Sequence, residues 1–92
     1  MATLHMEVEA TQGTQQKMVS QKEAMVNELA TLTGQINQTV GSAWIGNSAS
    51  EFQQQYDALR GQITQQLEAL GQLAQALQGE IAQWQEMSAR MG

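Results

Sequence analysis

Apolar residues recur in the first half of the chain at intervals built from three and four positions. They are Leu4, Val8, Met18, Met25, Leu29, Leu32 and Ile36. The polar residues Thr11, Gln15 and Lys22 occupy places that this stripe skips. Such intervals keep side chains on one side of an α-helix. The pattern predicts a helix over about residues 6–41, closed at Gly41, because glycine readily adopts the left-handed conformation that ends helices.

The second half carries a longer and more regular stripe. Its members are Phe52, Tyr56, Leu59, Ile63, Leu67, Leu70, Leu73, Leu77, Ile81, Trp84, Met87 and Met91. Their mean step is close to the 3.5 residues of a left-handed supercoil. Ser48 precedes Glu51 by three positions, which is the spacing of a capping box at a helix start. A second helix is therefore predicted over about residues 48–90.

A short segment, about residues 42–47, separates the two predicted helices and contains Trp44-Ile45-Gly46. The chain has no proline to interrupt either helix. We expect an all-α fold, an antiparallel helix-turn-helix hairpin that forms one domain over residues 1–92. Folding about Trp44 would place Met18 near Leu70.

A lone hairpin of this kind has little interior, because two rods cover only one strip of each other. The apolar stripe is widest near the middle of the predicted rod. The predicted dimer face consists of Met18, Val19, Met25, Val26, Leu70 and Leu73. A second hairpin that covered these residues would complete a dimeric four-helix bundle.

Composition excludes several classes of partner. The formal net charge is -5 with only four basic residues, so no patch could neutralise many phosphates and nucleic acid is not expected as a ligand. An anionic membrane surface would repel the chain, and no apolar run is long enough for stable membrane insertion. The N-terminal residues lack the pattern of a signal peptide. The chain contains no cysteine, hence neither a disulfide nor a thiolate metal site.

The residues that could carry chemistry are few. One histidine and one aspartate, Asp57, are present, and their positions in the sequence indicate no acid-base pair. No His-x-x-x-His pair or acidic cluster has the spacing of metal ligands. The sequence therefore predicts no enzymatic activity, no cofactor and no metal.

Trp44, Gly46, Ala49 and Phe52, between two long helical segments, resemble the WXG family, the early secreted antigenic target-like proteins of bacterial type VII secretion. Trp44 and Gly46 match the signature turn of the family, and Phe52 matches the aromatic residue of the following helix. An alternative interpretation is purely structural. Trp44 would then cap the end of the core, and Gly46 would permit a turn conformation.

The resemblance implies a secreted protein without catalytic residues. It would pair with itself or with a related WXG-type chain, and a type VII secretion ATPase would export it from the cytoplasm to the cell surface or medium without a cleaved signal peptide. Many members or their partners carry Tyr-x-x-x-Asp/Glu near the C-terminus. Here Arg60 follows Tyr56 at that spacing, and Ser88 follows Trp84. We therefore expect a partner to supply the export signal.

Two other hypotheses compete with a role in secretion. The chain could be a cytosolic coiled-coil adaptor in which Trp44 only plugs the corner of the hairpin. It could also be a membrane-active amphipathic hairpin, although the acidic net charge disfavours this third possibility.

Overall fold

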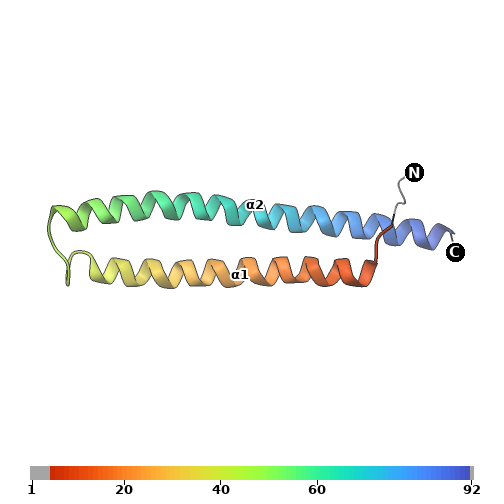
Figure 1. Ribbon diagram of the computed structural model, residues 1–92, viewed down its shortest axis with the longest axis horizontal. Helices are drawn as coiled ribbons and strands as arrows, with labels where there is room; N and C mark the ends of the chain where they lie inside the picture. Colours follow the sequence, from red (N-terminus) through yellow and green to blue (C-terminus); the bar gives the residue numbers. More distant parts are fainter. Residues whose placement is uncertain (1–4, 92) are drawn as a thin grey trace.

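A computed structural model describes residues 5–91, which form a helical hairpin (Figure 1). Helix α1 spans Val8–Thr39 and helix α2 spans Asn47–Met91. The two helices run antiparallel in a rod with extents of 68 × 23 × 17 Å. The described residues contain no β-strand, so the expectation of an all-α hairpin is confirmed. Leu4 of the predicted first stripe lies outside the described residues.

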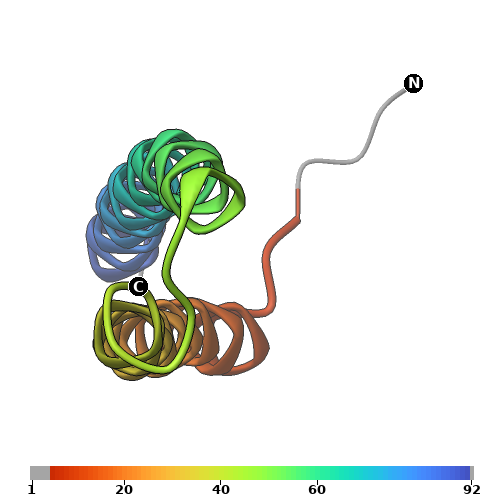
Figure 2. The same ribbon diagram turned by 90° about the vertical axis from the view of Figure 1, so that its left-hand side faces the viewer.

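Helix α2 is the longer element, with 45 residues against 32 in α1. Helix α2 extends past the end of α1 at the turn, and its last turns project beyond the start of α1 (Figure 1). Figure 2 views the rod from its turn end and shows α1 and α2 side by side, with no third layer over them. Each helix therefore contacts its neighbour on one strip and leaves the remaining surface uncovered.

Two glycines shape the connection between the helices. Val40 is extended and ends α1, and Gly41 follows with a φ of 94°. The Gly41 N–H donates to the Trp44 carbonyl at 2.8 Å, which closes the turn. Gly46 has a φ of 129° immediately before α2. A side chain at either position would strain the backbone, so both glycines are required by the turn itself.

The start of α2 differs from the expected capping box. The helix begins at Asn47, so Ser48 already lies inside its first turn. The Ser50 N–H donates to the carbonyl of Gly46 at 3.1 Å, and no side-chain hydrogen bond joins Ser48 to Glu51 in the described part of the chain. The capping-box prediction was wrong because the Gly46 backbone starts the helix one residue earlier.

The two helices contribute unequally to the seam between them. Every buried hydrophobic residue belongs to α2: Ala49, Tyr56, Leu67, Ala74 and Ile81. No residue of α1 is buried. The half-buried residues of α1 that line the seam include polar ones as well as apolar ones. They are Val8, Thr11, Gln12, Gln15, Met18, Lys22, Leu29, Thr33 and Ile36.

The polar residues in the seam correct one sequence-based expectation. Gln15 and Lys22 do not stand outside the contact stripe, because both lie against α2. Gln15 Nε2 donates to the Ala74 carbonyl at 3.3 Å. The Lys22 side chain lies over Gly71, where an added Cβ would come within 3.0 Å of Lys22 Nζ. A glycine on α2 thus provides the room for a long polar side chain of α1.

Four contacts fix the register of the hairpin. They join Gln15 to Ala74, Lys22 to Gly71, Thr33 to Tyr56 and Asn37 to Gln53. In each pair the two residue numbers add up to between 89 and 93. A residue of α1 therefore lies level with the residue of α2 whose number is about 90 minus its own.

Candidate interaction surfaces

The signature turn presents a partly exposed aromatic pair. The Trp44 and Phe52 rings lie 5.3 Å apart between centroids at an interplanar angle of 47°. Trp44 is 39% exposed, and it lines a hollow together with Leu32 and Ile36 of α1. Ile45 beside it is 75% exposed. Trp44 therefore packs against the end of the seam and still offers surface for another molecule.

The turn and the segments on either side of it carry no charge. No ionisable side chain occurs from Leu29 to Ser50, a segment that covers the last third of α1, the turn and the start of α2. The nearest charged residues of α2 at this end are Glu51, Asp57 and Arg60. The turn itself can thus be covered by a partner without burial of a charged group.

One side of the rod carries a stripe of apolar residues on each helix, interrupted on α2 by Gln66 and Glu80, and we call it the apolar face. Its members are Met18, Met25 and Leu32 of α1 with Phe52, Leu59, Leu73 and Met87 of α2. Within each helix they recur at seven residues or multiples of seven, close to whole numbers of helical turns. Met18 lines a groove with Leu70, and Leu32 lines one with Phe52, so the two stripes flank the same side of the seam.

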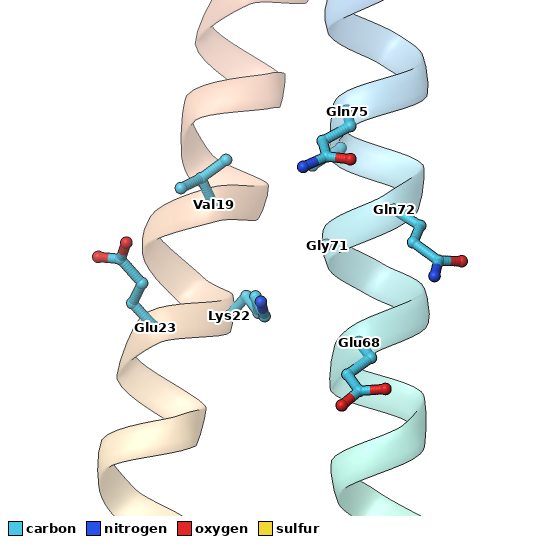
Figure 3. A pocket seen from close by; sticks show the side chains of 8 residues that line it. Val19, Lys22, Glu23, Glu68, Gly71, Gln72 and Gln75 are labelled. Atoms are coloured by element: carbon cyan, nitrogen blue, oxygen red, sulfur yellow. The ribbon is translucent and has the colours of Figure 1, made fainter.

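The other side of the rod is different in character, and we call it the polar face. Figure 3 shows its central groove, in which Lys22 points across the seam toward Gly71 while Glu23 points away from α2. Val19, Glu68 and Gln75 also line this groove. Carboxylates and amides thus surround the apolar side chains on this side.

The six residues of the predicted dimer face divide between these two faces. Met18 and Leu70 line the groove on the apolar side, and Met25 and Leu73 continue the apolar stripes. Val19 lines the central groove of the polar face. Val26 lines another hollow there, together with Lys22, Glu23 and Asn27. Their role as a dimer face stays a prediction, since a single chain contains no partner.

Sequence reasoning did not select Leu32, Leu59 and Met87 for the interaction surface. Each lies seven or fourteen residues from a residue of the predicted dimer face, either Met25 or Leu73. That spacing was the available signal. Met25 and Val26 lie on different faces because successive residues of an α-helix point about 100° apart.

Charged groups of the described residues lie apart from one another. Two ion pairs occur, and both are exposed: His5 with Glu7 at 3.9 Å, and Glu86 with Arg90 at 2.7 Å. No three histidines or acidic residues within residues 5–91 come together as metal ligands would. No helix in that part of the chain is both long and apolar enough to cross a membrane. The surfaces available for function are therefore the turn end and the two faces.

These features define a small two-helix hairpin whose connection carries a tryptophan and two glycines. A family model described as "Proteins of 100 residues with WXG" matches residues 3–83. The chain belongs to this family, WXG100, which confirms the resemblance seen at Trp44 and Gly46. Its members are small, helical, non-enzymatic proteins associated with type VII secretion, and they form dimers. Neither curated proteins nor solved structures gave a match.

Proposed function

We propose that the chain is a type VII secretion substrate or secreted adaptor that acts by protein-protein association as a dimer. The observation that carries the proposal is the apolar face. Leu73 is 60% exposed, and Leu59, Met87, Leu32, Met25 and Phe52 are also exposed. Soluble monomers rarely expose a contiguous apolar patch of more than a few hundred Å². A second hairpin on this face would form a four-helix bundle and remove these side chains from water.

The energetics favour such a pairing. Burial of apolar surface contributes about 25 cal/mol per Å². On the side of α1, the seam within one hairpin consists partly of polar residues, and no residue of α1 is buried. The single hairpin therefore gains little from its own core, and association would supply the missing burial. The dimer face then also includes Leu32, Leu59 and Met87, and Val19 and Val26 contribute less to it.

We propose that the exported species is the dimer, in which this chain pairs with an identical or related WXG-type chain. Within these 92 residues no tyrosine precedes an acidic residue by four positions. A complex could carry the export signal on one of its chains for both. In this proposal the secretion ATPase recognises the assembled pair, and the turn with Trp44 and Gly46 contributes to recognition. The protein would be made in the cytoplasm and exported without a cleaved signal peptide.

Expression in a bacterium with a type VII system tests this function. The chain is produced with and without its genomic neighbour, and culture medium and lysate are assayed for it. We expect export of the wild type in at least one of these settings, and loss of export for a Met25→Glu, Leu73→Glu double variant. The Val26→Glu variant, altered on the polar face, is the matched control.

Two outcomes would contradict the proposal. Efficient export of the double variant as a monomer would show that pairing is not needed. Retention of the wild type in the lysate under every combination would favour the cytosolic coiled-coil adaptor.

A further inference from the structure

The methionine side chains of the described residues fall into two groups. Met6 and Met18 are half-buried, whereas Met25 is 43% exposed and Met87 is 49% exposed. Both exposed methionines belong to the apolar face, to which Met18 also belongs. The methionines that solvent reaches most easily are therefore the ones whose side chains form the candidate interface.

The two exposed methionines lie in open parts of the rod. Met25 stands in a run of exposed residues, 23–28, between the seam residues Lys22 and Leu29. Met87 stands in another exposed run, residues 85–90, on the part of α2 that projects beyond α1 (Figure 1). A small solute can therefore reach either side chain without a movement of the helices.

Methionine is the one residue type of the apolar face that mild chemistry makes polar. A peroxide converts the thioether into a sulfoxide, which is a polar and chiral group. Leucine and phenylalanine, the other residue types of the face, do not react in this way. These 92 residues contain no cysteine, whose thiolate would compete for the oxidant. Oxidant that reaches this chain is thus directed to its methionines.

We propose that Met25 and Met87 are reversible oxidation sites, and that their oxidation by a hydroperoxide blocks pairing through the apolar face. The inference rests on the proposed function, because that function requires a partner chain to cover this face. The thioether sulfur attacks the terminal oxygen of the hydroperoxide, so that an S–O bond forms while the O–O bond breaks. The departing oxygen takes over the proton of the attacked oxygen and leaves as water or an alcohol. The sulfur loses two electrons, and the peroxide gains them.

A sulfoxide on the apolar face opposes association. On the separate hairpin its oxygen accepts hydrogen bonds from water, and burial against apolar side chains removes these bonds without replacement. The stripe neighbours of Met25 are Met18 and Leu32, and neither side chain has a donor to offer. The added oxygen also needs space that a close-packed interface lacks. The oxidised chain is therefore expected to stay unpaired.

Oxidation and pairing exclude each other, while the hairpin itself is spared. Met25 and Met87 are accessible on the separate hairpin, whereas a partner on the apolar face would shield them. No methionine of the described residues belongs to the buried core. A sulfoxide at either site thus acts on association and leaves the packing between α1 and α2 intact.

The modification is reversible by a known class of enzyme. Methionine sulfoxide reductases, one for each sulfoxide epimer, restore the thioether. In that step two thiols are oxidised to a disulfide, and the oxygen leaves as water. A chain that had lost its partner through oxidation would then regain the apolar surface that pairing requires.

Treatment of the purified full-length chain with hydrogen peroxide tests the sites. Trypsin cleaves after Lys17, Lys22, Arg60 and Arg90, so Met18, Met25 and Met87 fall in separate peptides, residues 18–22, 23–60 and 61–90. Mass spectrometry of samples taken over time gives the sulfoxide fraction of each peptide. In dilute, unpaired protein we expect Met25 and Met87 to oxidise on the order of three times faster than Met18, because oxidation follows exposure.

Association is then measured by sedimentation velocity, for the chain alone and with a related WXG-type chain. We expect oxidation to raise the dissociation constant about ten-fold or more, as burial of a polar group without a partner does. Incubation with both reductases and a dithiol should restore the original constant. Circular dichroism should show the same helix content before and after oxidation.

Three variants separate the sites from general damage. The Met25→Leu, Met87→Leu double variant keeps an apolar side chain of similar volume, so it should pair like the wild type and continue to pair after peroxide treatment. Met25→Gln places a polar side chain at the first site and should weaken pairing without any oxidant. Val26→Gln, at an equally exposed position on the polar face, is the matched control and should pair like the wild type.

The possible outcomes distinguish this inference from the proposed function. Equal oxidation rates at Met18 and Met25 would overturn the assignment of the sites. Normal pairing of the oxidised wild type, peroxide sensitivity that persists in the double leucine variant, or loss of helix content on oxidation would overturn the effect on the interface, while the proposed function stands. An untreated wild type that pairs with neither itself nor a related chain contradicts both.

Discussion

The apolar and polar faces flank the same seam, and Met25 and Val26 show how they differ. The two residues are adjacent in sequence and each is 43% exposed. Met25 continues a stripe from Met18 to Leu32, whereas Val26 lines a hollow with Lys22 and Glu23. Isolated exposed apolar side chains are common on soluble proteins. Continuity along the rod, and not the exposure of a single residue, therefore distinguishes the candidate interface.

Charges placed on the apolar face should have the largest effect. We expect the Met25→Glu, Leu73→Glu double variant to raise the dissociation constant of the dimer more than 1,000-fold, because an unpaired buried charge costs about 3–5 kcal/mol. Sedimentation velocity over a range of concentrations measures this change. Val26→Glu should shift the constant less than three-fold. A comparable loss of association in the Val26→Glu control would remove the distinction between the faces.

The turn should show an intermediate effect. Trp44→Ala is expected to lower the free energy of unfolding by about 2 kcal/mol, less than the 3–5 kcal/mol typical of fully buried tryptophan, because Trp44 is 39% exposed. Helix content by circular dichroism should stay nearly unchanged, since the turn joins the helices and does not form them. Ile45→Ala, at a more exposed position, is the control. No change in either stability or export for Trp44→Ala would leave the signature residue without a role here.

The seam between the faces should show a smaller effect. The Tyr56 and Thr33 hydroxyl oxygens lie 2.6 Å apart, and the Thr33 hydroxyl also donates to the Leu29 carbonyl. Tyr56→Phe should lower the free energy of unfolding by about 1 kcal/mol, since it removes one hydrogen bond and leaves Thr33 with another partner. Urea unfolding measures the loss. In the Thr33→Val background the same substitution should cost less, and an equal cost would mean that the contact contributes nothing.

Two glycines of α2 should give the smallest effects. Gly61→Ala is expected to stabilise the protein by up to about 1 kcal/mol, because no atom lies within 4 Å of the added Cβ and alanine favours helix. Gly71→Ala should gain less, since Lys22 must move away from the seam. Thermal unfolding of both variants at equal concentration compares them. A larger gain for Gly71→Ala would show that Lys22 does not need the space over Gly71.

The sequence predicted the hairpin well because α2 carries a long stripe with few polar interruptions. It also identified Trp44 and Gly46, since their spacing matches a family signature. The seam of α1 was harder to predict. Gln15 and Lys22 are residue types that usually lie on an exposed surface. They fit into the seam because Gln15 donates a hydrogen bond to the Ala74 carbonyl and Lys22 occupies the space over Gly71.

The division of the dimer face needed three-dimensional information for a different reason. Val19 and Val26 are as apolar as their neighbours Met18 and Met25, so composition alone groups all four together. Their separation depends on a rotation of about 100° per residue and on which side of α1 faces α2. The side of α1 that faces α2 could not be identified as long as Gln15 and Lys22 were taken as gaps in the stripe.

Because α1 begins and α2 ends at the same end of the rod, anything fused to either terminus would emerge far from the turn of its own chain (Figure 1). A reporter domain on either terminus would thus leave Trp44 and Ile45 of the same chain accessible, whereas a label attached near the turn would cover them.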